Sequence, residues 1–353
     1  MEQKILTLGI VLNNEEYKNL DVFLNKFYNF FFAGKINNIE ILILLNKKKE
    51  ENKEINQEEI LTKNEIIEKW KSILKENIYV FKTENIAFPN SIKELLFLCK
   101  TKYILFTKLN EDLNIDGLNS AIHSISNSEK ENDILISNNN DNKFFLNHFL
   151  SKKHYSFRKM KKYFSSVYDK IWNVNFFNKY YQNQEEIEQY SYLYEPCLTI
   201  LLFLKAKNMR FINKTFTIKN NLKTASNGYN DNNINVKISE EQNEMFQFFL
   251  NNFKKEDISY KKEKLFFIKI IKYILIIIFK KTNTKIVEQN INIFWEKIRK
   301  MGYNEFIFYK KNIKRSFISN IFLPQTEKKE YKIVSKLLRK NIPSYFPNSP
   351  FLG

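Results

Sequence analysis

Ile5-Leu6-Thr7-Leu8-Gly9-Ile10-Val11-Leu12 is the stretch that decides the fold. This apolar run is rich in residues that favour β-structure, and it predicts a buried strand. It is too short to hold a signal-peptide core together with a cleavage site, so we expect no export. Downstream of it, the pattern continues with helical spacing over residues 17–32, an apolar run over residues 39–45 and helical spacing over residues 58–74. The order is therefore strand, helix, strand, helix.

The alternation continues through the first half of the chain. Short strands are predicted at residues 78–81, 103–106 and 133–137, with helices between them at residues 92–99 and 118–125. Near-continuous apolar strands separated by amphipathic helices are what a parallel sheet covered on both faces requires. We therefore predict an α/β fold with a doubly wound, mostly parallel sheet and helices on both of its faces.

The second half of the chain has a different character. A polar, turn-rich stretch at residues 225–233 is the clearest boundary, so we expect a first domain over residues 1–225, a polar linker over 226–240 and a mainly helical, basic C-terminal region over 241–353. That region contains the apolar run 265–279, which carries two lysines and is shorter than the ~20 residues of a membrane span. It is either a core helix packed on the first domain or an amphipathic helix lying in an anionic membrane surface.

Composition narrows the class of partner. The 353 residues carry 57 Lys and Arg against 39 Asp and Glu, a net charge of +18 that suits nucleic acid, an anionic lipid surface or a phosphorylated substrate. The lysines come with abundant Asn, Ile, Phe and Tyr, as an AT-rich coding sequence would produce without selection, so a nucleic-acid partner rests on charge alone and is not expected. The two cysteines, Cys99 and Cys197, exclude a disulfide framework and a four-Cys metal site, and they fit a reducing, cytoplasmic compartment.

Polar residues follow four of the predicted strands. Open α/β sheets bind their ligands at the carboxyl ends of parallel strands. A polar residue at one strand end is common, whereas four in register indicate a ligand site. These residues are Asn13 and Glu15 after the first strand, Asn46 after the second, Asn85 and Asn90 after the third, and Lys108, Asn110, Glu111 and Asp112 after the fourth.

In these motifs and their order, the chain resembles the family 2 glycosyltransferases with the GT-A fold, of the type that builds bacterial surface polysaccharides. The resemblance covers roughly residues 3–225. It is carried by Leu12-Asn13-Asn14-Glu15-Glu16 after the first strand, by the strand Tyr103-Ile104-Leu105-Phe106, and by the segment from Val167 to Phe177 with its Lys170. It implies a nucleotide-sugar donor, a hydroxyl acceptor on a glycan or glycolipid, and inversion at the anomeric carbon. The expected place is the cytoplasmic face of a membrane, with peripheral contact to anionic lipid.

The resemblance also implies roles for individual residues. The family's helix-opening Glu-Asp pair falls on Tyr194-Glu195, so Glu195 would be the general base that deprotonates the acceptor. The alternative is an acid that caps the start of a helix. The residues that would hold the nucleotide sugar are Asn13, Glu15, Asn46, Asn85, Asn90, Lys108, Asn110 and Lys170.

The metal-binding motif of the family departs from its usual form here. Its Asp-x-Asp aligns with Lys108 and Asn110, so only Glu111 and Asp112 could supply carboxylates to a Mg²⁺ or Mn²⁺ ion. Two alternatives remain open. Lys108 substitutes as the cation beside the diphosphate, or the site has lost its activity. In the second case the chain would be a non-catalytic GT-A-like subunit that docks on a membrane or a partner enzyme.

Overall fold

The computed structural model divides the chain into two compact units. Unit 1 comprises residues 1–143, 168–190 and 206–226, and unit 2 comprises residues 144–167, 191–205 and 227–353. The polar linker predicted over residues 226–240 lies outside the described residues, and the predicted domain limits stay a prediction. The structure describes residues 4–12, 17–33, 38–46, 57–83, 88–137, 166–181, 194–219, 246–247, 249–251, 261–315 and 325–344.

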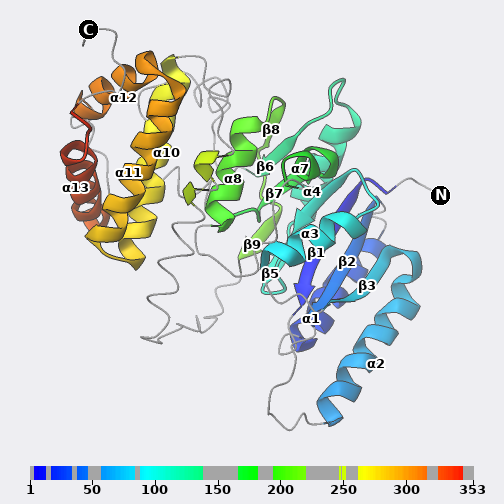
Figure 1. Cartoon of the computed structure of the whole chain (residues 1–353). Coiled ribbons are helices and arrows are strands. Elements are labelled where there is room, and N and C mark those ends of the chain that lie inside the picture. The colour runs from blue at the N-terminus through cyan, green and yellow to red at the C-terminus, as the bar shows by residue number, and fades with distance from the viewer. Residues whose placement is uncertain are drawn as a thin grey trace. The chain divides into compact units, whose positions relative to one another are not determined.

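Unit 1 is built on a seven-stranded sheet with the order β3-β2-β1-β4-β7-β6-β8 (Figure 1). The first four strands in this order are parallel to one another, and β8 is parallel to β6. Strand β7 runs antiparallel to both of its neighbours. The predicted α/β fold with a mostly parallel sheet is therefore confirmed. The strands are β1 (Leu6–Leu12), β2 (Ile39–Asn46), β3 (Ile78–Thr83), β4 (Tyr103–Phe106), β6 (Ile134–Ser137), β7 (Lys170–Asn173) and β8 (Met209–Ile212).

A second sheet of two strands accompanies the large one. Strand β5 (Glu111–Leu113) pairs antiparallel with β9 (Thr217–Lys219), more than a hundred residues later in the chain. Neither strand could be predicted from the sequence, because three polar or mixed residues make no apolar run and no clear alternation. This small sheet carries two of the residues that shape the candidate site.

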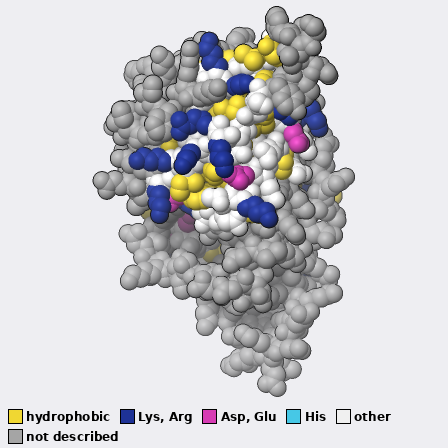
Figure 2. All heavy atoms as spheres, turned by 60° about the vertical axis from the view of Figure 1, so that its left-hand side comes forward, with side chains coloured by type: hydrophobic (Ala, Val, Ile, Leu, Met, Phe, Trp, Pro, Cys, Tyr) yellow, Lys and Arg dark blue, Asp and Glu magenta, His cyan; other side chains and the backbone are white. Residues whose placement is uncertain are grey.

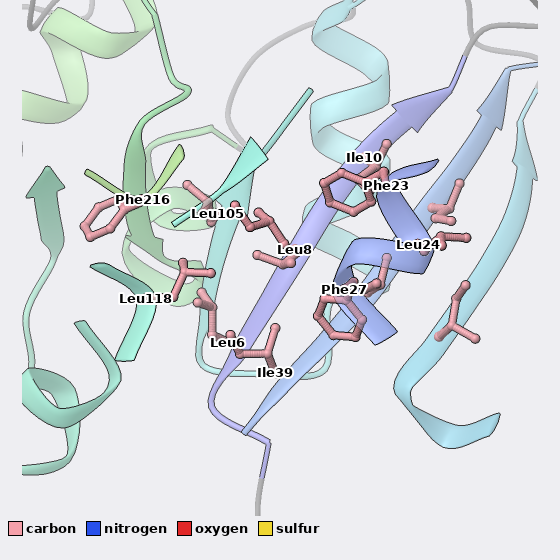
Figure 3. Packing of buried hydrophobic residues seen from close by; sticks show 14 of the residues in the cluster. Leu6, Leu8, Ile10, Phe23, Leu24, Phe27, Ile39, Leu105, Leu118 and Phe216 are labelled. Carbon is pink, nitrogen blue, oxygen red and sulfur yellow. The ribbon is translucent and has the colours of Figure 1, made fainter. Parts of the chain in front are cut away.

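The helices of unit 1 bury one stripe each against the sheet. Every residue of β1 from Leu6 to Ile10 is buried, so both faces of this strand are covered, since successive side chains point to opposite faces. Figure 3 shows Phe23, Leu24 and Phe27 of α1 packed beside Leu6, Leu8 and Ile10. The helices are α1 (Tyr17–Phe32), α2 (Gln57–Leu74), the 3₁₀ turn η2 (Lys75–Asn77), α3 (Phe88–Leu98), α4 (Ile115–Ser126) and α7 (Val174–Tyr181).

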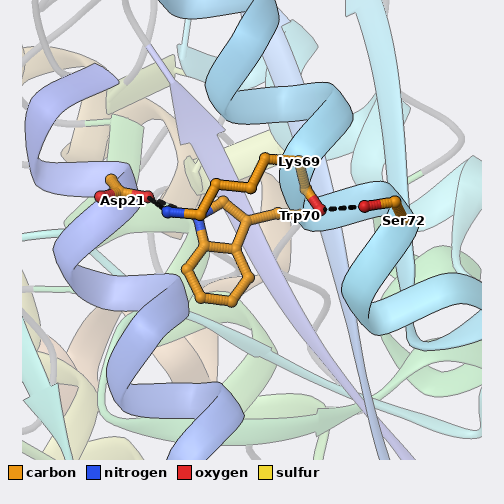
Figure 4. Close-up of polar contacts among 4 residues, drawn as sticks. All are labelled: Asp21, Lys69, Trp70 and Ser72. Carbon is orange, nitrogen blue, oxygen red and sulfur yellow. Dashed lines mark hydrogen bonds and ion pairs between the residues drawn. The ribbon is translucent and has the colours of Figure 1, made fainter.

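A polar contact fixes α2 against α1 (Figure 4). The indole nitrogen Nε1 of the buried Trp70 donates to Oδ1 of Asp21 at 2.6 Å, and Nζ of Lys69 donates to the same oxygen at 3.0 Å. The hydrogen bond from Trp70 is the main reason that the pKa of the Asp21 carboxyl lies below its usual value. Its contribution to stability is therefore present above pH ~4 and is lost as the pH falls through the lowered pKa.

Unit 2 contains α8 (Tyr194–Lys205) and a cluster of four C-terminal helices. Helix α10 contacts each of the other three, and its side chains from Phe267 to Ile278 are almost all buried. The rings of Phe267, Phe294 and Tyr309 lie 6.1–6.4 Å apart between their centroids. The apolar run at residues 265–279 is thus a core helix, with α11, α12 and α13 as its partners. The four helices are α10 (Lys261–Lys281), α11 (Thr284–Met301), α12 (Tyr303–Arg315) and α13 (Gln325–Lys340).

The exposed surface of these four helices is basic. Among the residues of these helices whose exposure the structure describes, Glu296 is the one exposed acid, and on the face that Figure 2 brings forward basic side chains are more frequent than acidic ones. Within the described part of the chain, no helix combines the length and the apolar character that crossing a bilayer needs. The exposed lysines are Lys280, Lys285, Lys300, Lys311, Lys329, Lys332, Lys336 and Lys340.

Candidate functional site

Four parallel strands end at one edge of the large sheet of unit 1. Leu12 at the end of β1 lies opposite Leu45 of β2. Asn46 at the end of β2 lies opposite Thr83 at the end of β3. Strand β4 ends opposite Gly9 of β1. The strand ends predicted from the sequence therefore do meet at one edge, where open α/β sheets bind their ligands.

The turn that follows β4 presents a lysine at this edge. The backbone N–H of Thr107 donates to the carbonyl of Gly9 at 3.0 Å, and the backbone N–H of Glu111 donates to the carbonyl of Lys108 at 3.1 Å. These bonds fix both ends of the turn. The side chain of Lys108 is exposed, and its Nζ lies 4.3 Å from the centre of the Tyr168 ring. A cation over an aromatic face is held by the ring's quadrupole.

Tyr168 reaches this edge because β7 runs antiparallel to β4, with Ile171 opposite Leu105. The residues just before β7 therefore lie at the edge where β4 ends. Asp169 adopts a left-handed conformation with φ of 59°, which Asp tolerates better than most residues. The ammonium of Lys170 donates to the carbonyl of Tyr168 at 3.1 Å, so the loop is fixed from within unit 1.

Thr217 of β9 joins two carboxylates. Its hydroxyl oxygen lies 2.7 Å from Oε2 of Glu111 and 2.8 Å from Oδ1 of Asp169. A hydroxyl has one proton, so it donates to one of these oxygens at a time. Both Glu111 and Thr217 are buried. The contact ties the small sheet to the loop before β7, and it withdraws the Glu111 carboxylate from the surface.

The two carboxylates proposed as metal ligands do not converge. Glu111 and Asp112 are successive residues of β5, so their side chains point to opposite faces. Oδ1 of Asp112 accepts a hydrogen bond from Nζ of Lys26 at 2.5 Å. In the part of the chain that the structure describes, no group of three or more His, Cys, Asp or Glu residues could hold a metal ion. The residues present at the turn after β4 therefore do not fit a divalent cation.

The other residues predicted to bind the nucleotide sugar differ in how exposed they are. Asn110 is exposed in the turn after β4, and Asn90 is half-buried in the first turn of α3. Lys170 is 2% exposed, and its ammonium is directed to the Tyr168 carbonyl rather than to the surface. Asn13, Glu15 and Asn85 lie outside the described residues, as does the side chain of Asn46 at the end of β2.

Glu195 occupies the first turn of α8 in unit 2. Its Oε1 accepts hydrogen bonds from the hydroxyl of Ser166 and from the backbone N–H of Val167, the latter at 2.9 Å. No hydrogen bond from a described residue reaches its Oε2. A carboxylate with one oxygen fixed and the other open has the arrangement that a positioned proton acceptor needs. The same bonds also suit a structural acid that anchors the Ser166–Val167 segment.

No sequence pattern marked Tyr168, Asp169, Thr217 or Ser166 as site residues. Tyr168 and Asp169 lie in the quoted segment around Lys170, where only the lysine was given a role. Thr217 is 106 residues away from Glu111 and 48 from Asp169, so no local pattern could connect them. The residue type of Asp169 is the one local signal for the left-handed turn before β7, a strand that was not predicted from the sequence.

No family model matches the chain, and no curated protein matches it in sequence. In structure it is similar to TarS, a glycosyltransferase of S. aureus. The TarS 1–349 structure matches with a TM-score of 0.56 and 13% identity, over 95% of this chain and 91% of that chain. The same fragment in complex with UDP-GlcNAc matches with a TM-score of 0.54 and 14% identity, over 97% and 93%. Another structure of TarS matches with a TM-score of 0.53 and 12% identity. This match covers 95% of this chain and 55% of that chain. The fold is GT-A-like.

Proposed function

We propose that the chain is a glycosyltransferase that moves a sugar from a nucleotide-sugar donor to a hydroxyl group of a glycan or glycolipid, with inversion at the anomeric carbon. The observation that carries the proposal is the meeting of the ends of β1, β2, β3 and β4 with Lys108 and Tyr168 at one edge of a GT-A-like sheet. Such edges are where open α/β sheets bind ligands. The solved complexes of TarS with UDP-GlcNAc and with UDP support a nucleotide sugar as the ligand.

The proposed reaction is a single displacement. The acceptor hydroxyl oxygen forms a bond to the anomeric carbon, and the bond from that carbon to the nucleoside diphosphate breaks with the electron pair leaving on the phosphate. The acceptor proton passes to Oε2 of Glu195, the carboxylate oxygen that accepts no hydrogen bond from a described residue. Attack from the face opposite the leaving group inverts the anomeric configuration. Glu195 thus serves as general base, and Ser166 and Val167 position it.

Donor binding provides the direct test. We expect one of UDP-, GDP- or CDP-linked sugars to bind the 353-residue chain with a dissociation constant between about 1 μM and 1 mM, the usual range for enzyme substrates. Isothermal titration calorimetry of each donor, with Mn²⁺ and with EDTA, measures this constant. If all three donor classes give no heat under both conditions, the chain has no nucleotide-sugar site and the proposed function is wrong.

A non-catalytic GT-A-like subunit is the second candidate. The observation in its favour is the replacement of the family's two carboxylates by Lys108 and Asn110. The two candidates differ in turnover, because a non-catalytic subunit could bind the donor without breaking the bond between the sugar and the nucleoside diphosphate. Incubation of the bound donor with cell-envelope acceptors, with release of the nucleoside diphosphate followed in time, separates them. Release above that of the Glu195→Gln variant supports the enzyme.

We also propose that unit 2 makes peripheral contact with the anionic inner face of the cell membrane through its exposed lysines. Lys332 and Lys336 lie one turn apart on α13, and both are exposed. Each lysine near an anionic surface contributes ~1 kcal/mol, so the double variant Lys332→Glu/Lys336→Glu is expected to lower partition onto phosphatidylglycerol vesicles by at least about tenfold. Lys93→Glu/Lys130→Glu in unit 1, which has the same net charge, is the control. Equal partition of the two double variants in a co-sedimentation assay would contradict the proposal.

A further inference from the structure

We infer that the nucleoside diphosphate bound at the carboxyl edge of unit 1 is neutralised by the ammonium of Lys108 rather than by a divalent cation. The inference rests on the proposed function and states how that site accepts its diphosphate. Lys108 is the second residue after β4, and its side chain is exposed at the edge where the four parallel strands end.

The two carboxylates of β5, Glu111 and Asp112, are engaged elsewhere. Oε2 of Glu111 lies 2.7 Å from the Thr217 hydroxyl, and this glutamate is 7% exposed. Asp112 lies on the opposite face of β5 and pairs with Lys26. Mg²⁺ and Mn²⁺ need carboxylate oxygens that reach them, and a divalent cation placed beside Lys108 would also be repelled by its charge. The exposed ammonium of Lys108, with both carboxylates of β5 engaged, thus suits an anion better than a divalent cation.

Tyr168 holds the Lys108 side chain at the edge. The ammonium lies 4.3 Å from the centre of the tyrosine ring, and the Tyr168 carbonyl in turn accepts a hydrogen bond from the buried Lys170 at 3.1 Å. The ring therefore has a fixed backbone beneath it. A lysine that is ordered before the ligand arrives loses less conformational entropy on binding a phosphate. Lysine binds phosphate oxygens as a compact point charge with three donors.

The chain contains a matched control for this lysine. Lys100 stands before β4, at the opposite end of the same strand, and its ammonium lies 4.7 Å from the centre of the Tyr79 ring. Both lysines are exposed, and both lie over a tyrosine. Lys100→Gln therefore removes the same charge and the same type of contact at the edge that the proposal does not use.

The test is calorimetric titration of the 353-residue chain with UDP, GDP and CDP, in EDTA and in Mn²⁺. For the nucleotide that binds, we expect its affinity in EDTA to stay within about tenfold of its affinity in Mn²⁺. Lys108→Gln is expected to weaken binding in EDTA by about tenfold or more, and Lys100→Gln by less than about twofold. Lys108→Arg keeps the charge and is expected to bind more tightly than Lys108→Gln. The Lys108→Gln substitution is also expected to weaken the binding of the corresponding monophosphate (UMP, GMP or CMP) by a smaller factor than it weakens the binding of the diphosphate.

Three results would overturn the inference while leaving the proposed function intact. The first is a loss of affinity in EDTA larger than about tenfold in the unmodified chain, which would show dependence on a metal. The second is a loss of diphosphate affinity in EDTA smaller than about tenfold for the Lys108→Gln variant. The third is an equal loss of diphosphate affinity in the Lys108→Gln and Lys108→Arg variants. A different result, no binding of any of the three diphosphates in either condition, would overturn the proposed function itself and the inference with it.

Discussion

Replacing Glu195 with Gln will lower the turnover number of sugar transfer by about 10²- to 10⁴-fold and leave the dissociation constant of the donor unchanged. The amide still accepts hydrogen bonds from the Ser166 hydroxyl and the Val167 N–H through Oε1, so the start of α8 keeps its anchor. What the amide loses is the ability to take a proton from the acceptor hydroxyl. Steady-state release of the nucleoside diphosphate measures turnover, and calorimetry measures donor binding.

Three further variants make the assignment of Glu195 specific. Glu129→Gln changes an exposed carboxylate on unit 1 and is expected to leave turnover unchanged. Ser166→Ala removes one of the two donors to Oε1, and loss of one positioning bond is expected to lower turnover by about tenfold. Glu195→Asp keeps a base on a shorter side chain and should retain more activity than Glu195→Gln. If Glu195→Gln transfers sugar at the unmodified rate and only unfolds earlier, Glu195 is a structural acid at a helix start.

Replacing Gly117 with Ala is expected to lower the free energy of unfolding of unit 1 by about 3 kcal/mol. Gly117 lies in the first turn of α4, and a Cβ there would stand 1.8 Å from the carbonyl oxygen of Thr215. Backbone cannot move aside as the tip of a side chain can, so α4 and the segment before β9 must separate. The helix-propensity gain of Ala over Gly, about 1 kcal/mol, is too small to offset this.

The separation would also break a set of polar contacts at the start of α4. The side chain of Asn114 accepts a hydrogen bond from the Gly117 N–H at 3.3 Å and donates to the Thr215 hydroxyl at 3.1 Å. The Asn114 N–H donates to the Phe216 carbonyl at 2.9 Å. Since Thr217 follows directly, we expect Gly117→Ala to weaken the contact between Thr217 and Glu111 as well.

Denaturant titration followed by tryptophan fluorescence measures this effect. In a Trp295→Phe background, the remaining tryptophans of the chain are Trp70 and Trp172, which both belong to unit 1. Their signal therefore reports on unit 1 alone. Asn119→Ala, at an exposed position of the same helix, is the control and is expected to shift stability by less than about 0.5 kcal/mol. Equal unfolding midpoints for the two variants would mean that the contact at Gly117 is not tight.

The order of strands and helices in unit 1 could be predicted because its signals are local. The run at residues 5–12 became β1 (Leu6–Leu12), and the helical spacing at residues 17–32 became α1 (Tyr17–Phe32). Strand β4 (Tyr103–Phe106) has the predicted limits. In contrast, β5 and β9 have three residues each, and their pairing brings together segments far apart in the chain. No periodicity can be read from three residues, so these strands are visible only in the folded chain.

The position of the candidate site at the sheet edge could be predicted from the sequence, whereas the side-chain contacts within it could not. The sheet edge follows from the positions of the strand ends, so the turn that carries Lys108 and Asn110 follows β4 as expected, and their role in binding stays a prediction. The contact of Lys108 with Tyr168 depends on the antiparallel direction of β7, which the sequence does not state. Glu111 and Asp112 are neighbours in sequence, but the strand geometry of β5 sends them to opposite faces. Adjacent charges therefore suggested a shared role that the backbone does not allow.

The pairing of β5 with β9 has a consequence for the timing of synthesis. Thr217 meets Glu111 across 106 residues, so the link between the small sheet and the loop before β7 cannot form until the ribosome has released almost the whole of unit 1. At a translation rate of ~5–20 residues per second, this delay lasts about five to twenty seconds after Glu111 has emerged. During that interval β1, β2 and β3 can already associate, since their contacts are closer in sequence. The nascent chain therefore acquires a nucleus early and its small second sheet only at the close of its first unit.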